Sequence, residues 1–354
     1  MGLVVASLAL AAAACAGSSG EPSGASGPAA GASGSSASST GPPTTAVRTP
    51  GTTVPVATAA CGPAAAGLTR SAHVARTVDV DGDERQVKEY LPASYGTEPM
   101  PVVIQLHGYL SGADGQIAMS AIEPLAESAG FVVLTPQGSG DLPYWNAVPH
   151  ADLPDDLGFV RTLIDDVTAH RCVDPSRVYV VGMSNGAFLT SLVACRLADR
   201  VAAVAAVAGL QTPKGCDPSR AVPVLAIHGT GDTFVPADGT RGPALDTLAW
   251  DHASTRAFDG LPWTPVRTAV ADRARLAGCD LTPATSTPWP AITELRYGSC
   301  GEGADVELLE VAGGGHTWPG SRFSQASAAI LGATTTEVDG DQVIWDFLRQ
   351  HRLG

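Results

Sequence analysis

The chain of 354 residues is poor in charge, and above all in basic residues. Charged residues make up 16% of it, and 21 Lys and Arg stand against 35 Asp and Glu, which gives a formal net charge of −14. Such an acidic surface repels phosphate groups, so nucleic-acid binding and adsorption to anionic membranes are poor hypotheses. No apolar run reaches the roughly 20 residues that span a bilayer. These absences favour a neutral or small-molecule substrate.

The seven cysteines include no closely spaced pair, so we expect no zinc site, and nothing else in the sequence implies a metal or an organic cofactor. In an exported protein, the six cysteines after position 60 would form up to three disulfides, with 15 possible connectivities. We predict one pair, Cys279 with Cys300, because these two bracket a segment rich in Pro and Thr that reads as a loop. The cysteines indicate an oxidising compartment.

Residues 1–15 resemble an export signal. Leu3 to Ala14 is apolar apart from Ser7, is too short to span a membrane, and ends in small residues before Cys15. This arrangement resembles a bacterial lipoprotein signal, although Ala12 stands where a leucine is common. We predict a lipid on Cys15, with plain secretion as the alternative. Either way the protein would be extracellular or at the cell surface, with that lipid as its one membrane contact.

Residues 16–60 consist mainly of Gly, Ser, Ala, Pro and Thr and contain no aromatic side chain. Such a segment buries too little apolar surface to fold. We predict a disordered tether that reaches roughly 35–40 Å on average. The remaining residues, 61–354, are expected to form one catalytic domain, and their oligomeric state stays open.

The pattern of residues 61–354 predicts an α/β fold. His73–Val80 and Arg85–Leu91 alternate in polarity around a turn, as in an antiparallel hairpin. Six short apolar runs then alternate with helical patterns, which is typical of a mainly parallel sheet with helices on both faces. The runs are Val102–Leu106, Phe131–Thr135, Val178–Met183, Val201–Ala208, Val222–Ile227 and Val306–Val311. The expected helices lie around 157–167, over Asn185–Leu197 and around 343–348.

The segment Gly182-Met183-Ser184-Asn185-Gly186 is the one G-x-S-x-G string in the sequence. It lies between a predicted strand and a predicted helix, which is the setting that a nucleophile elbow requires. Side chains at Gly182 and Gly186 would collide across the turn. The helix N-terminus would present N–H groups to a developing oxyanion. We predict that Ser184 is a nucleophile; the alternative is a capping serine in a turn flanked by glycines.

A serine nucleophile needs a base and a carboxylate that orients the base. In the chain order serine, acid, histidine, Asp232 follows one predicted strand, and His316 follows another in a Gly-rich loop. Both would lie at the carboxyl edge of the sheet. The alternatives are a surface carboxylate at Asp232 and a structural residue at His316. His107 and His228 also end strands, and we expect both to be buried and hydrogen-bonded.

The loop after the strand 102–106 contains His107-Gly108-Tyr109. An N–H from such a loop normally completes the oxyanion hole beside the N–H that follows the nucleophile. We therefore assign the two donors to the backbone of Tyr109 and Asn185. The alternative is that Gly108 merely allows a tight turn.

From about Tyr90 to Phe347 the sequence resembles the secreted α/β-hydrolase esterases of the polyhydroxybutyrate depolymerase-like and feruloyl or acetylxylan esterase-like family. The matching segments are Leu106–Gly108, Asp174–Tyr179, the elbow around Ser184, His228–Asp232 and Gly315–Gly320. The resemblance implies the α/β-hydrolase fold, a triad of Ser184, Asp232 and His316, and hydrolysis of carboxylic esters through an acyl-enzyme.

The family's aromatic loop over the site resembles Tyr144-Trp145-Asn146, although many relatives have a cysteine pair where Ala147–His150 stands here. We predict that Trp145 and Trp318 bind substrate by stacking on an aromatic acyl group or a sugar, with packing as the alternative. The expected substrate is a neutral polysaccharide ester, feruloyl or acetyl, or a short polyester. The alternatives are a polyhydroxybutyrate oligomer depolymerase, a serine peptidase of the same fold and a non-catalytic cell-surface binding protein.

Overall fold

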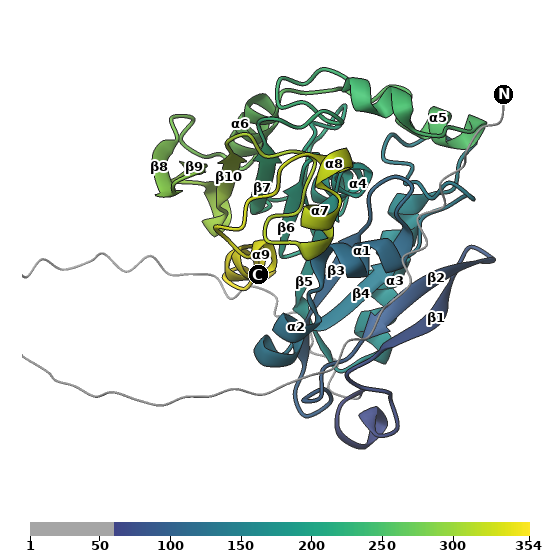
Figure 1. The fold of residues 1–354 in the computed structure, drawn as a ribbon. Coiled ribbons are helices and arrows are strands. Elements are labelled where there is room, and N and C mark those ends of the chain that lie inside the picture. Colours follow the sequence, from purple (N-terminus) through teal and green to yellow (C-terminus); the bar gives the residue numbers. More distant parts are fainter. Residues whose placement is uncertain (1–59) are drawn as a thin grey trace, which may run out of the picture. The chain divides into compact units, whose positions relative to one another are not determined.

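One sheet with ten strands organises the described part of the chain (Figure 1). The computed structural model describes residues 60–354, so the predicted export signal at 1–15, with Cys15, and the predicted tether up to residue 59 lie outside the described residues. The strands are β1 (His73–Val80), β2 (Asp83–Tyr90), β3 (Met100–Leu106), β4 (Val132–Pro136), β5 (Val173–Met183), β6 (Ala203–Val207), β7 (Val224–Gly229), β8 (Ala284–Trp289), β9 (Ile292–Tyr297) and β10 (Val306–Val311).

The sheet is parallel in its centre and antiparallel at both edges. Its strand order is β1-β2-β4-β3-β5-β6-β7-β10-β9-β8. The strands from β4 to β10 in this order pair in parallel. The outer pairs β1–β2, β2–β4, β10–β9 and β9–β8 are antiparallel. Each of the six predicted apolar runs overlaps one of the parallel strands, and the predicted hairpin is the β1–β2 pair, so the α/β prediction is confirmed.

Helices pack on both faces of this sheet. The α-helices are α1 (Gly112–Ser120), α2 (Glu123–Ala129), α3 (Asp156–His170), α4 (Asn185–Arg196), α5 (His252–Phe258), α6 (Val266–Leu276), α7 (Arg322–Ala326), α8 (Ala328–Leu331) and α9 (Gly340–Leu348). One apolar core includes residues of α3, α4 and α6, and the other includes residues of α1, α2 and α9. Val102 and Ile104 of β3 belong to the first core and Val103 to the second, because successive strand residues point to opposite faces. From residue 60 onward, no helix combines the length and the apolar character needed to cross a membrane.

Three disulfides cross-link the described residues: Cys61–Cys172, Cys195–Cys216 and Cys279–Cys300. The third is the pair predicted from the sequence. The segment that it closes is not the expected loop, however, because it contains the β8–β9 hairpin. Pro288 made that segment read as a loop, but β8 is an edge strand, where the missing N–H of a proline is tolerated.

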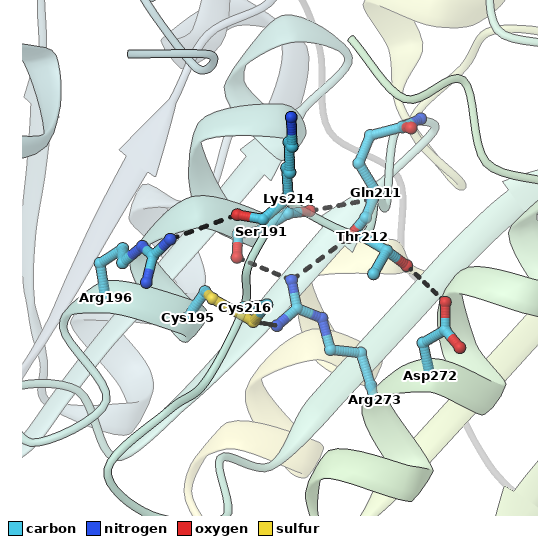
Figure 2. The surroundings of a disulfide bond; sticks show 9 residues. All are labelled: Ser191, Cys195, Arg196, Gln211, Thr212, Lys214, Cys216, Asp272 and Arg273. Carbon is cyan, nitrogen blue, oxygen red and sulfur yellow. Dashed lines mark hydrogen bonds between the residues drawn. A yellow bond between two sulfur atoms is a disulfide. The ribbon is translucent and has the colours of Figure 1, made fainter.

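The disulfide Cys195–Cys216 joins the end of α4 to the segment after β6 (Figure 2). Buried Arg273 of α6 lies beside it and donates hydrogen bonds to Ser191 O over 2.7 Å and to Gln211 O over 3.2 Å. Another guanidinium nitrogen lies 3.4 Å from Cys216 Sγ. Burial lowers the pKa of Arg273 to about 10. These contacts hold the helix that follows β5 firmly against α6.

Candidate active site

Ser184 occupies the sharp turn between β5 and α4. Its backbone lies at φ 55° and ψ −121°, a strained conformation of the kind that clusters at functional sites. A Cβ at Gly182 would come within 2.3 Å of Gly186 O, and a Cβ at Gly186 would come within 2.2 Å of Leu106 O. Neither position therefore accepts a side chain, as the sequence pattern predicts. The turn leaves the Ser184 side chain half-buried at the carboxyl edge of the parallel strands.

Asp232 and His316 form a buried hydrogen-bonded pair. His316 Nδ1 donates to Asp232 Oδ2 over 2.7 Å, and the two residues are 6% and 4% exposed. Asp232 Oδ1 accepts the backbone N–H groups of Phe234 and Val235 at 2.8 and 2.9 Å. Burial raises the pKa of Asp232, but the charge of His316 and its hydrogen bond outweigh burial and hold the pKa below its ordinary value. The ionised carboxylate keeps the imidazole proton on Nδ1, which leaves Nε2 free to accept another.

Backbone contacts fix the two loops that carry this pair. Thr230 N donates to Val311 O over 2.9 Å, and Gly231 N donates to Gly314 O over 2.8 Å. Gly313 N donates to Thr230 Oγ1 over 2.8 Å. The loops follow β7 and β10, which are parallel neighbours. Asp232 and His316 are therefore positioned by the ends of two adjacent strands, a rigid placement of the kind that catalytic groups require.

The backbone N–H groups of Tyr109 and Asn185, the predicted oxyanion donors, lie close to the serine. Asn185 is the first residue of α4, where backbone N–H groups have no partner within the helix. Tyr109 follows the end of β3, where a Cβ at Gly108 would lie 3.3 Å from Ser184 Cβ. Within residues 60–354, neither N–H donates a hydrogen bond to another protein group. Both are therefore free to bind a negatively charged oxygen.

Two buried histidines support these loops. His107 Nε2 accepts the N–H of Gly138, and His107 Nδ1 donates to Gly108 O, both over 2.8 Å. Burial lowers the pKa of His107 to about 4. His228 Nε2 donates to Val235 O over 2.8 Å, and burial also lowers its pKa. Both are therefore neutral, hydrogen-bonded structural residues, as expected from the sequence.

Trp145 and Trp318, the predicted substrate-binding residues, are 0% and 1% exposed. Trp145 Nε1 donates to His107 O over 2.8 Å, and Trp318 packs into the core on the α9 side of the sheet. Neither indole has a face that a substrate could reach, so the stacking prediction is wrong for both and the packing alternative describes them. The prediction rested on their positions in the sequence beside the predicted catalytic segments, and such positions do not determine the direction in which a side chain points.

Ser184 and His316 line one cavity of about 150 Å³. Its walls are largely apolar and include Phe234, Leu245, Leu248, Phe258, Ile330 and Leu331. In the part of the chain that the structure describes, no hydrogen bond joins the serine hydroxyl to the imidazole; such bonds are often long in free enzymes.

Sequence reasoning did not find these wall residues. Phe234 could have been predicted, because it directly follows the loop of Asp232. In the structure its ring packs on His316, with ring centroids 5.0 Å apart. Leu245 and Leu248 lie in and beside the short 3-10 helix Pro243–Thr247, in a segment without periodicity.

Together the Ser184 hydroxyl, the oriented imidazole and the two free N–H groups can transfer an acyl group from an ester to water.

Comparison with known sequences places this geometry in a chemical context. Residues 86–226 match the model of the family described as Esterase PHB depolymerase. The chain is 31% identical over 291 residues to NocK of Nocardia uniformis subsp. tsuyamanensis, a protein assigned as an esterase; the match covers 77% of this chain and 82% of NocK. It is 28% identical over 279 residues to feruloyl esterase B of Piromyces equi, which covers 76% of this chain and 46% of that protein. The chain thus spans less than half of the feruloyl esterase.

A solved structure shares the fold. The acetyl xylan esterase from Aspergillus awamori superimposes with a TM-score of 0.53 at 16% identity, over 72% of this chain and 98% of that one. This likeness shows that the sheet and its helices form an α/β-hydrolase fold.

Proposed function

Because the chain belongs to the family described as Esterase PHB depolymerase and is a carboxylic ester hydrolase, we propose that Ser184, Asp232 and His316 form its catalytic triad. The observation that carries this proposal is the buried 2.7 Å hydrogen bond between His316 and Asp232, at a cavity that His316 shares with Ser184. The backbone N–H groups of Tyr109 and Asn185 form the oxyanion hole.

The first half of the reaction forms an acyl-enzyme. Ser184 Oγ attacks the ester carbonyl carbon while His316 Nε2 takes the hydroxyl proton, and Asp232 stabilises the resulting imidazolium. The negative charge that develops on the carbonyl oxygen is met by the two backbone N–H groups. When the tetrahedral intermediate collapses, the bond to the alcohol oxygen breaks, and His316 gives its proton to the leaving alcohol.

The second half releases the acid. Water attacks the acyl-enzyme carbonyl while His316 Nε2 takes a proton from it, and the serine then leaves with that proton. The carboxylic acid departs and the free enzyme is restored.

The proposed substrates are feruloyl or acetyl esters of polysaccharides, or short polyesters. Support comes from the relatives: a feruloyl esterase matches 76% of this chain, and the family description names PHB depolymerase. The acidic composition, with a net charge of −14, favours neutral substrates over anionic ones.

We also propose export, with a lipid on Cys15 and residues 16–60 as a tether for the domain at 61–354. The apolar run before Cys15 and the composition of the next 45 residues support this proposal. Labelling with a radioactive fatty acid in a bacterial host tests it. Incorporation that is lost in Cys15→Ala is expected, whereas equal incorporation in both proteins, or none in either, contradicts lipid attachment.

The function itself is tested by product release from methyl ferulate, acetylated xylan and hydroxybutyrate oligomers, with Ser184→Ala as the blank. Release of ferulate or acetate that is lost in the variant is expected. Release of hydroxybutyrate alone would assign the enzyme to polyesters. Equal inactivity of both proteins on all three substrates and on an activated ester would overturn the catalytic proposal.

A further inference from the structure

A second, larger cavity lies beside the catalytic one. It measures about 580 Å³ and lies against α5 and the segments on either side of that helix, which runs along the top of the view in Figure 1. Its walls combine three aromatic residues, Trp250, Phe258 and Trp263, with polar side chains such as Arg241 and Arg256.

Aromatic contacts connect the two cavities. Phe258 lines both of them. Tyr109 of the catalytic cavity stacks on Trp250 of the larger one, with ring centroids 4.6 Å apart. The Tyr109 hydroxyl also donates to Ala249 O over 2.5 Å, which fixes this layer to the segment before α5. A substrate bound at Ser184 that is too large for the catalytic cavity would therefore extend into the larger cavity.

The volumes of the two cavities suit different parts of an ester substrate. Pockets for complete small-molecule ligands measure about 300–1,000 Å³, and the catalytic cavity at about 150 Å³ falls below that range. It has room for a small acyl group beside the nucleophile. The larger cavity, at about 580 Å³, lies within the range and can hold the bulkier remainder of the substrate.

Two indoles offer rigid apolar surface in this cavity. Trp250 and Trp263 are both half-buried. Trp250 Nε1 donates to Leu245 O over 2.9 Å, which fixes the ring. Trp263 has a φ of 43°, a strained value for a bulky residue, and its ring meets Phe188 edge-on. Strained residues of this kind cluster at ligand clamps, and a fixed indole is a suitable surface for the apolar face of a sugar ring.

Both arginines of the cavity are already paired with carboxylates. Arg241 pairs with Asp246 over 2.5 Å. Arg256 pairs with Asp259 over 2.8 Å and with Asp152 over 3.4 Å. An anionic ligand therefore finds no unpaired arginine, because three carboxylates surround the two arginines. The unused guanidinium N–H groups can still donate to hydroxyl groups. This combination fits a neutral, polyhydroxylated ligand.

We propose that the larger cavity binds a neutral saccharide, which is the alcohol side of the ester, while the catalytic cavity holds a short acyl group. The assignment rests on the proposed function and narrows it to short-chain acyl esters of neutral polysaccharides, such as acetyl esters. Trp250 and Trp263 determine this specificity.

Two kinetic comparisons test the assignment. For Trp250→Ala and Trp263→Ala, kcat/KM on acetylated xylo-oligosaccharides should fall at least tenfold more than kcat/KM on p-nitrophenyl acetate, mainly through KM. Thr255→Trp should give the same pattern, because Thr255 is an exposed wall residue and a larger side chain there would fill the cavity without removing a contact. Trp289→Ala is the matched control, since Trp289 is a half-buried tryptophan of β8 outside both cavities.

A binding measurement separates this proposal from the catalytic one. Ser184→Ala should bind xylohexaose in a calorimeter, and adding Trp263→Ala should weaken that binding at least tenfold. The saccharide site would be overturned if Ser184→Ala did not bind xylohexaose. It would also be overturned if the tryptophan variants lost kcat/KM equally on both ester substrates, or lost it selectively on a hydroxybutyrate trimer. A wild-type protein that binds xylohexaose but does not hydrolyse p-nitrophenyl acetate would instead overturn the triad and leave the saccharide site standing.

Discussion

Asp232 Oδ2 accepts the Nδ1 proton of His316 over 2.7 Å, in a pair that is almost fully buried. The other carboxylate oxygen accepts two backbone N–H groups of the following turn. The Asp232 side chain thus both orients the His316 imidazole and fixes its own loop. The pair joins the loops after β7 and β10, which are far apart in the sequence and adjacent in the sheet.

Asp232→Asn should separate these two roles. The amide can keep the contacts to the backbone N–H groups, but it does not stabilise the imidazolium and favours the wrong tautomer of His316. We expect kcat on p-nitrophenyl acetate to fall by about 10⁴-fold, the size of the effect in a comparable triad, with little change in unfolding temperature. A loss of less than tenfold would show that Asp232 does not serve the base.

Asn185→Ala should affect stability more than catalysis. Asn185 Oδ1 accepts the N–H of Trp145 over 2.7 Å, and its Nδ2 donates to the carbonyl of Trp145 over 3.1 Å. Without this side chain, the buried N–H of Trp145 loses its partner, whereas the carbonyl of Trp145 still accepts the N–H of Ala147 over 3.0 Å. The unsatisfied N–H costs about 1–3 kcal/mol. The backbone N–H of residue 185 remains. Urea unfolding should show the loss of stability, while kcat should fall by far less than in Ser184→Ala; an equal fall would mean that the side chain acts in catalysis.

Glu307 should make the protein less stable as the pH rises. Burial raises its pKa to about 7, against the attraction of Arg296 at 3.1 Å. Between about pH 4.5 and 7, Glu307 holds a proton in the folded state that it has lost in the unfolded state. Its contribution to the free energy of unfolding, roughly 3 kcal/mol, is therefore fully present below about pH 4.5 and is lost as the pH rises to about 7. The free energy of unfolding of Glu307→Gln, relative to that of wild type, should therefore be higher at pH 8 than at pH 5. Exposed Glu98→Gln is the control, and equal shifts in both variants would refute the assignment.

The three disulfides should contribute unequally to stability. Cys61–Cys172 closes a separation of 111 residues, and the other two close 21 each. The chain-entropy estimate gives about 5 kcal/mol for the first and about 3 kcal/mol for each of the others. Chemical denaturation of the three double Cys→Ser variants measures this order. A smaller loss for the Cys61–Cys172 variant than for the other two would show that enthalpic terms dominate.

The sequence predicts well those features that depend on backbone geometry. Buried parallel strands require continuous apolar runs, and the residues at their carboxyl ends must meet at one edge, as Asp232 and His316 do. The glycines around Ser184 are likewise necessary, because a Cβ at either would strike backbone atoms.

Features that depend on side-chain direction or on tertiary context are harder to predict. Nothing in the sequence distinguishes Trp145, which points inward, from Trp250, which lines a cavity. The cavity wall at Leu248 comes from a connection without periodicity, and its place is set by the elements around it. The β8–β9 hairpin was missed because the tolerance of Pro288 depends on its position at the sheet edge.

The most direct test of the central claim is covalent labelling of Ser184. Wild-type protein treated with diethyl p-nitrophenyl phosphate should gain one diethylphosphoryl group per chain, on the peptide that contains Ser184, as measured by intact mass and peptide mapping. Ser184→Ala should gain none, and His316→Ala should react at least 10³-fold more slowly, because the hydroxyl then lacks its base. Labelling of Ser184→Ala at the wild-type rate, or a wild-type protein that does not react, would contradict the triad.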